Sequence, residues 1–216
     1  MHQVSDRMNR VLPSATSAVL NLAAKLREQG RDIISLGAGE PDFDTPDHIK
    51  ESAINGINSG QTKYTAIDGT ASLKNAIQKK FKDDNNLDYE HDEIIVSSGA
   101  KQTLFNLCMG LLGDGDEAII PSPFWVSYPD MVRIADAKPI FIDTGIENDF
   151  KISAEQLDNA INKKTKLLFL NSPSNPTGSC YSKNDLLKLA KVLLRNPGIY
   201  IASDDIYEKI HWGPSK

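Results

Sequence analysis

The stretch TKLLFLNSPSNPTG, residues 165–178, joins an apolar run to a loop that carries two prolines, two asparagines and a glycine. The run TKLLFL predicts a buried strand, and the breakers that follow end this strand at once. A plain β-turn needs fewer breakers than these eight residues carry, which favours a loop that holds a ligand. A cis bond between Asn175 and Pro176 would fix a tight turn and present Asn175 rigidly.

On both sides of this stretch, short apolar runs alternate with helical patterns. Strands are expected at 32–36, 92–99, 116–123, 137–143, 165–173 and 199–207. Helices are expected at 13–30, 46–59, 70–82, 100–112, 125–134, 153–161 and 182–195. This alternation predicts an α/β fold, a mostly parallel sheet with helices on both faces in three α/β/α layers.

Composition restricts the classes of function. The 216 residues carry a formal net charge of -5, and this charge disfavours a nucleic-acid binder, which would show a basic field. The first ten residues are polar, and no apolar run approaches the roughly 20 residues of a membrane helix. Two cysteines without a CxxC pair predict a reduced, cytoplasmic protein, and four widely spaced histidines argue against a metal site.

In open α/β sheets, ligands bind beyond the carboxyl ends of the strands, so the loops there are the candidates for a site. SSGAKQT, residues 97–103, opens a helix whose N–H groups suit an anion. The same residues are also compatible with an ordinary strand–helix turn that binds no ligand. It is neither a P-loop nor a GxGxxG motif, so nucleotide binding is not indicated. Trp125 can stack on a flat ring or pack in the core.

The stretch ASDDIYE, residues 202–208, ends a predicted strand with two carboxylates. A carboxylate near the sheet edge needs a partner, and a protonated ring nitrogen would serve. The alternative is a helix N-cap by Asp205. Tyr207 can direct a phenol at the same ligand.

Taken together, these motifs resemble the aspartate aminotransferase family, the class I, fold-type I pyridoxal-phosphate (PLP) transferases, and most of all its bacterial branch, some members of which also use prephenate. The motifs run in the family's order and cover nearly the whole chain. They are LGAGEPDFDTP (36–46), KYTAIDGTASLKNAI (63–77), SSGAKQTLFN (97–106), PSPFWVSYPDMV (121–132), NSPSNPTG (171–178) and SDDIYE (203–208).

The resemblance implies roles for the polar residues of these loops. Asn175 would bond the cofactor's ring hydroxyl oxygen and help to hold the substrate carboxylate. Asp204 would pair with the protonated pyridine nitrogen, which keeps the ring an electron sink. Asp204 is preferred to Asp205 because the family places a tyrosine three residues after this aspartate, as Tyr207 is here. Tyr207 would donate to the ring oxygen.

The resemblance also implies the rest of the binding site. Trp125 would stack on the ring and border the substrate. The backbone amides of Gly99, Ala100 and Lys101 would take the phosphate. Tyr64 resembles a tyrosine that reaches the phosphate of the neighbouring subunit, which implies a homodimer with shared sites. Gly39 would meet the substrate's α-carboxylate.

The implied activity is a PLP-dependent aspartate transaminase. It would move the amino group of aspartate to 2-oxoglutarate, giving oxaloacetate and glutamate, by ping-pong Schiff-base chemistry. No metal is implied.

The chain departs from the family at its carboxyl end. The Schiff-base lysine lies a few tens of residues beyond the Asp–Tyr pair in the family, after another strand, and the arginine for the α-carboxylate lies later still. Lys216 is too close to Tyr207 and no strand intervenes, and Lys101 at a helix start suits phosphate or surface contacts. No catalytic lysine is therefore assigned.

The sequence thus resembles an amino-terminal half, truncated before the small C-terminal domain. Residues 1–45 would be a segment associated with the small domain, and 46–216 part of the large PLP-binding domain. Alone, the 216 residues are expected to be inactive.

Alternatives stay open within and outside the family. The enzyme could act on aromatic amino acids, prephenate or alanine. Relatives that accept prephenate often carry a lysine where Leu12 stands, which disfavours that substrate. A non-catalytic, truncated cofactor-binding fragment and a nucleotide-binding α/β protein are the remaining hypotheses.

Overall fold

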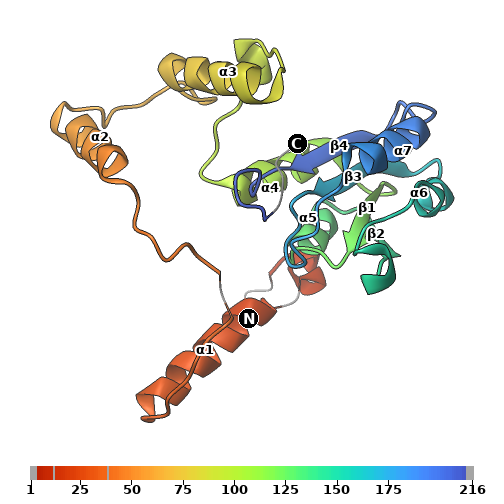
Figure 1. Cartoon of the computed structure of the whole chain (residues 1–216), viewed down its shortest axis with the longest axis horizontal. Helices are drawn as coiled ribbons and strands as arrows, with labels where there is room; N and C mark the ends of the chain where they lie inside the picture. The colour runs from red at the N-terminus through yellow and green to blue at the C-terminus, as the bar shows by residue number, and fades with distance from the viewer. Residues whose placement is uncertain (1–3, 12, 38, 213–216) are drawn as a thin grey trace. The chain divides into compact units, whose positions relative to one another are not determined.

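The computed structural model describes residues 4–11, 13–37 and 39–212 and divides the chain into two compact units. One unit is Pro13–Ser98, and the other combines Met1–Leu12 with Gly99–Lys216. The second unit contains the sheet (Figure 1).

The sheet has four parallel strands in the order β2-β1-β3-β4. Their bounds are Glu117–Ser122 (β1), Lys138–Asp143 (β2), Thr165–Asn171 (β3) and Tyr200–Asp204 (β4). Asn171 pairs with Asp204 at the end of the β3–β4 register. The strands are parallel, so the loops that follow β1, β3 and β4 leave the sheet at the same edge.

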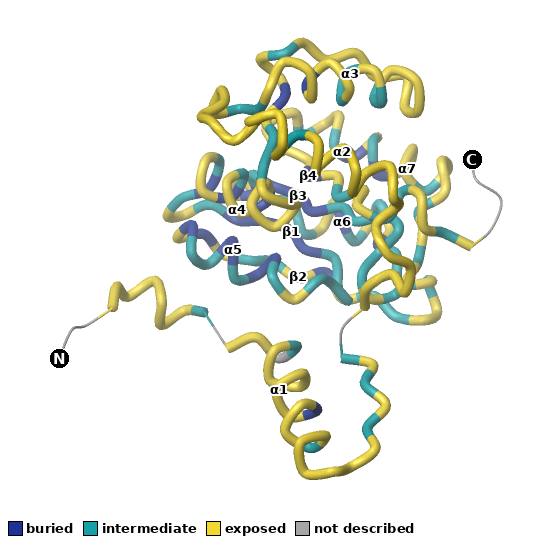
Figure 2. The backbone as a smooth tube through the Cα atoms, turned by 90° about the vertical axis from the view of Figure 1, so that its left-hand side faces the viewer, coloured by how far each residue is buried: buried dark blue, intermediate teal, exposed yellow. Residues whose placement is uncertain are grey.

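Helices cover both faces of this sheet. They are α4 (Ala100–Leu111), α5 (Tyr128–Ile134), α6 (Ala154–Ala160) and α7 (Lys183–Leu193). Neighbouring residues on the strands enter different cores because side chains alternate along a strand. Ile120 and Phe169 pack with α4 and α5, whereas Ile119 and Leu168 pack with α6 and α7. The buried residues follow the strands in Figure 2. The predicted three-layer arrangement is confirmed.

Two short 3₁₀ helices belong to the same unit, η1 (Asp6–Arg10) and η3 (Ile146–Asn148). Arg10 in η1 forms an ion pair with Asp136, which follows α5.

The other unit consists of α1 (Ala15–Glu28), α2 (Asp47–Asn58), α3 (Ala71–Asn85) and the 3₁₀ helix η2 (His91–Glu93). The starts of α1 and α3 are set by local signals, since the N-cap residues Ser14 and Thr70 accept hydrogen bonds from first-turn amides. In α3, the buried Lys74 pairs with Asp68 and donates to the carbonyl of His91. These contacts tie α3 to η2.

Two predicted strands, 32–36 and 92–99, are wrong. Ile34 and Leu36 are 89% and 93% exposed, and within the described residues neither stretch joins a sheet. The N–H of Val96 donates to the carbonyl of Asp68, which does not lie in a strand. An apolar run becomes a strand only when a neighbour completes its hydrogen bonds.

The helix predicted from Trp125 begins at Tyr128. Pro129 explains this shift, because proline has no N–H and its ring clashes with the carbonyl four residues earlier, here that of Trp125. Pro129 is therefore tolerated in the first turn and excludes an earlier start.

Within the described residues, no helix combines the length and apolar character needed to span a membrane.

Candidate cofactor site

A cavity of about 180 Å³ lies where β1, β3 and β4 end and α4 begins. Six of the residues predicted for the site line it together. The lining consists of Ala100, Lys101, Trp125, Tyr128, Asn171, Asn175, Asp204, Ile206 and Tyr207.

Local structure explains how these side chains meet. Trp125 lies between the end of β1 and the start of α5. Asp204 is the last residue of β4, and Tyr207 lies in the turn that follows. Asn175 lies in the loop after β3, and its bond to Pro176 is cis, the geometry that the sequence had left open.

The Asp204 carboxylate is held at both oxygens. The hydroxyl of Tyr128 donates to Oδ2 at 2.5 Å, and the backbone N–H of Ile206 donates to Oδ1 at 3.3 Å. The neighbouring Asp205 does not line the cavity, and it accepts a hydrogen bond from the hydroxyl of Ser203. Of the two aspartates, Asp204 is therefore the one presented to a ligand.

Tyr128 is a buried side chain that supports Asp204 and Trp125 at the cavity. It is 2% exposed, its ring stacks on Phe169 at 4.7 Å, and Trp125 meets it edge-on at 5.4 Å. Burial, with the hydrogen bond to Asp204, raises the pKa of the Tyr128 phenol. Tyr128 therefore remains a neutral donor to Asp204 across the physiological pH range.

Lys101 supplies a positive charge at the cavity. Its Nζ lies 5.1 Å from the ring centre of Trp125, a cation–π contact. Of the lysines in the described ranges, Lys101 is the one that lines the cavity. Lys216 lies outside the described residues.

The start of α4 is open to an anion. Its N-cap residue, Gly99, has φ 88° and no side chain to accept from the first-turn amides. A Cβ at Gly99 would meet nothing within 4 Å in the described chain. The first N–H groups of a helix have no carbonyl partner four residues earlier, and together with the helix dipole they favour a phosphate or carboxylate.

Two predicted site residues, Tyr64 and Gly39, belong to the other unit. Both are exposed, and the Tyr64 side chain is fully so. They are not among the residues that line the cavity, and their roles stay predictions.

The cavity lining also includes three residues that were not predicted for the site: Tyr128, Asn171 and Ile206. A usable signal existed for two of them. Tyr128 follows Trp125 by three residues at a helix start, and Asn171 is the first residue of the breaker-rich loop.

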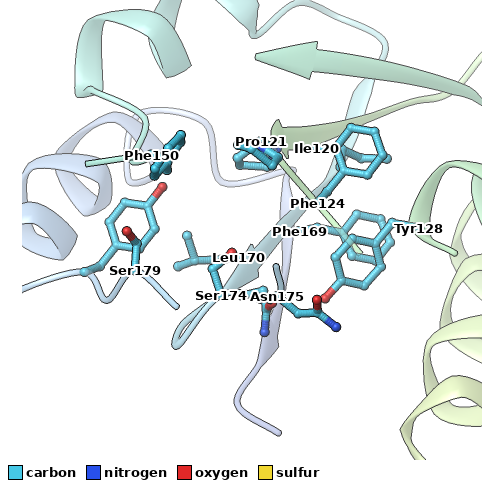
Figure 3. Close-up of a pocket in the computed structure, with 13 residues that line it drawn as sticks. Ile120, Pro121, Phe124, Tyr128, Phe150, Phe169, Leu170, Ser174, Asn175 and Ser179 are labelled. Atoms are coloured by element: carbon cyan, nitrogen blue, oxygen red, sulfur yellow. Dashed lines mark hydrogen bonds between the residues drawn. The ribbon is translucent and has the colours of Figure 1, made fainter. Parts of the chain in front are cut away.

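A second, smaller cavity of about 20 Å³ adjoins the first, and Tyr128, Asn171 and Asn175 line both. Figure 3 shows apolar residues of its lining, among them Ile120, Phe124 and Phe150, and the polar side chains of Ser174 and Ser179. This volume is comparable to that of one water molecule, so the larger cavity is the candidate for a cofactor.

The donor set of the larger cavity fits PLP. The phosphate matches the amides at the start of α4, and a protonated ring nitrogen matches the Asp204 carboxylate. Trp125 offers an aromatic face, while Asn175 and Tyr207 offer polar groups for a ring hydroxyl.

Comparison with known proteins agrees with this chemistry. The sequence model of the family described as aminotransferase class I and II matches residues 31–216. The chain is 56% identical over 208 residues to the aspartate/prephenate aminotransferase of Nitrosomonas europaea and 51% identical over 207 residues to that of Cereibacter sphaeroides. Each alignment covers 96% of this chain and 52% of the relative, so the chain spans about half the length of these curated relatives.

Solved structures give the same result. The aspartate aminotransferase of Rhizobium meliloti matches with a TM-score of 0.95 and 46% identity over 99% of this chain and 53% of that protein. The Thermus thermophilus aspartate aminotransferase with maleate matches with a TM-score of 0.90 and 44% identity, over 94% of this chain and 53% of that protein. On these matches in sequence and fold, the chain belongs to the class I and II aminotransferases, a family that depends on pyridoxal phosphate.

Proposed function

We propose that the chain is the cofactor-binding part of an aspartate transaminase, which moves the amino group of aspartate to 2-oxoglutarate. The observation that carries this proposal is the cavity in which Asp204, Asn175, Trp125 and Tyr207 meet beside the start of α4. Bound PLP would supply the electron sink that lets the amino acid exchange its amino group.

Each residue has a distinct task in this proposal. Asp204 holds the proton on the ring nitrogen, and the donors at its two oxygens keep its carboxylate in place. Asn175 and Tyr207 bond the ring oxygen, and Asn175 also orients the substrate carboxylate. Trp125 covers one face of the ring and excludes water there.

Other contacts fix the ends of cofactor and substrate. The amides of Gly99, Ala100 and Lys101 bind the phosphate. Gly39 meets the α-carboxylate, and Tyr64 reaches the phosphate of a second subunit in a homodimer. Residues 1–45 belong with a small domain and 46–216 with the large one. We place the protein in the cytoplasm.

The lysine that anchors the cofactor and moves the proton is not assigned to any residue of this chain. The activity is therefore proposed for the longest natural polypeptide that contains the sequence. The 216 residues alone are expected to bind PLP without turning over substrate.

The first test records the absorbance of this longest polypeptide with PLP, before and after aspartate is added. The expected result is a Schiff-base band that shifts to the pyridoxamine form, with 2-oxoglutarate reversing the shift. A spectrum of free cofactor that aspartate leaves unchanged would refute the transaminase proposal.

A matched pair of variants tests the assignment of the aspartate. Asp204→Asn should weaken PLP binding, because it removes the charge that pairs with the ring nitrogen. Asp205→Asn makes the same chemical change one residue away, outside the cavity lining, and should leave binding unchanged. Equal effects of the two variants would overturn the assignment of Asp204.

Prephenate is the second candidate substrate. Two relatives at 51–56% identity carry the name aspartate/prephenate aminotransferase, which favours it, whereas Leu12 disfavours it. Steady-state rates with 2-oxoglutarate and prephenate as acceptors separate the two, and aromatic amino acids and alanine as donors test the other class I substrates. A dominant aromatic rate would overturn the aspartate proposal.

A further inference from the structure

The Asn171 side chain bonds two parts of the cavity wall at once. Its Nδ2 donates to the backbone carbonyl of Asp204 at 2.7 Å, and its Oδ1 accepts from the backbone N–H of Asn175 at 2.7 Å. The first contact crosses from β3 to β4, and the second spans four residues of the loop after β3. One amide group thus joins the backbones that carry Asp204 and Asn175.

The strand register makes this geometry possible. Asn171 and Asp204 are paired at the ends of β3 and β4, so the side chain of one lies beside the main chain of the other. A carboxamide suits both contacts because it carries a donor and an acceptor on one planar group. Aspartate has the same shape without the donor, and serine is too short to span both partners.

We infer that Asn171 is a positioning residue that sets the spacing between Asp204 and Asn175 in the cofactor site. This inference rests on the proposed function, in which Asp204 meets the ring nitrogen and Asn175 the ring oxygen. These groups lie at different places on one rigid ring, so both bonds require a fixed distance between the two residues. A shift of the loop after β3 lengthens one bond or the other, and small displacements are costly.

The experiment uses the longest natural polypeptide and the variants Asn171→Ala and Asn171→Asp. Asn171→Ala removes both contacts. Asn171→Asp keeps an acceptor for the N–H of Asn175 and sets a carboxylate oxygen against the carbonyl of Asp204. The control is Asn184→Asp, which makes the same chemical change at an exposed position on α7.

Without cofactor, hydrogen exchange at the Asn175 amide reports the contact directly. Exchange should speed up in Asn171→Ala and stay slow in Asn184→Asp, and the melting temperature identifies any variant that fails to fold. Unchanged exchange at Asn175 in a folded Asn171→Ala variant would overturn the inference. This readout does not depend on whether PLP binds.

With PLP, both Asn171 variants should bind roughly tenfold more weakly than wild type. The pH at which the bound cofactor's absorbance band changes should also shift, which a purely structural role would not produce. In a double-mutant cycle with Asn175→Ala, the loss of PLP affinity caused by Asn171→Ala should be smaller than in the wild-type background. The reason is that part of this loss acts through Asn175. Additive losses and an unshifted band would overturn the inference, whereas a wild type that binds no PLP would refute the proposed function.

Discussion

The hydroxyl of Tyr128 donates a 2.5 Å hydrogen bond to Oδ2 of Asp204, although 76 residues separate the two in the chain. Tyr128 lies in α5 and Asp204 ends β4, so the contact joins a covering helix to the edge of the sheet. Tyr128 also packs against Trp125. One buried ring therefore supports two of the residues proposed to hold the cofactor.

Removal of this hydroxyl should weaken the site and leave the fold intact. Tyr128→Phe keeps the ring contacts with Trp125 and Phe169 and loses the donor to Asp204. A hydrogen bond to a charged group is worth roughly 1.5–3 kcal/mol, so we expect PLP to bind about 10- to 150-fold more weakly. Fluorescence titration with PLP measures the change.

The control for this variant is Tyr89→Phe. Tyr89 makes an edge-on ring contact with Phe81 at 5.4 Å, which phenylalanine retains. Equal PLP affinity of Tyr128→Phe and wild type would contradict a supporting role for the Tyr128 hydroxyl.

Gly69 should tolerate no side chain. It has φ 113°, and a Cβ there would lie 2.5 Å from Cγ2 of Val96. Gly69→Ala therefore adds a clash to the cost of a left-handed backbone, which is about 1–2 kcal/mol for an L-residue. Gly60→Ala, at φ 76° with nothing within 4 Å, should show the backbone cost alone.

Urea denaturation of both variants and of Gly69→Ala/Val96→Ala measures the difference. The double variant should recover the part of the loss due to the clash. If Gly69→Ala costs no more than Gly60→Ala, the close approach of Val96 does not matter for stability.

Ser182 should stabilise α7 in a pH-dependent way. Its hydroxyl accepts from the Asp185 N–H at 3.2 Å and donates to the Asp185 carboxylate at 2.8 Å, which lowers the pKa of that carboxyl. A folded-state pKa below the unfolded value gives stability that is present above about pH 4 and lost as the pH falls further. Ser182→Ala should cost about 1 kcal/mol at pH 7, and less at pH 3.

Denaturant unfolding at the two pH values checks this loss. Ser5→Ala is the control, since Ser5 stands at the N-cap of η1 without a side-chain capping bond. A Ser182→Ala penalty that is the same at pH 3 and pH 7 would show that the Asp185 carboxylate has no part in it.

The two cysteines should differ in reactivity. Cys180 is exposed, whereas Cys108 is fully buried and burial raises the pKa of its thiol to about 11. We expect a thiol reagent to label one cysteine in the native protein and two in denaturant, because the reactive form is the thiolate. Two thiols labelled at equal rates in the native protein would contradict this burial.

The raised pKa also predicts a pH dependence of stability. The contribution of the neutral Cys108 thiol is complete below about pH 9, the unfolded value, and declines as the pH rises towards 11. The wild type should lose stability relative to Cys108→Ala over this range, as measured by urea denaturation.

Much of the fold could be predicted because its signals are local. The apolar runs at 165–173 and 137–143 became β3 and β2, and Ser153 and Ser182 cap the predicted helices α6 and α7. Strand pairing is not local, and this explains the errors. Residues 32–36 have the composition of a strand, but within the described ranges they have no partner to complete their hydrogen bonds.

The site also divides into features that local sequence signals predict and features that depend on tertiary packing. Motif resemblance indicated Trp125, Asn175 and Asp204, and the structure brings them to one cavity. Sequence signals marked the positions of Tyr128 and Asn171, but their contacts with Asp204 were not predictable, because these depend on where β4 lies beside β3 and on the placement of α5. Such contacts appear only when the elements are packed together.

The long sequence separation between Tyr128 and Asp204 has a consequence for synthesis. The residues that line the cavity are synthesised at different times, since Tyr128 leaves the ribosome 76 residues before its acceptor Asp204. At a synthesis rate of roughly 5–20 residues per second, Tyr128 is made on the order of 4–15 s before Asp204 in β4. The nascent chain therefore presents the aromatic residues Trp125 and Tyr128 before the carboxylate of Asp204 that completes the cavity.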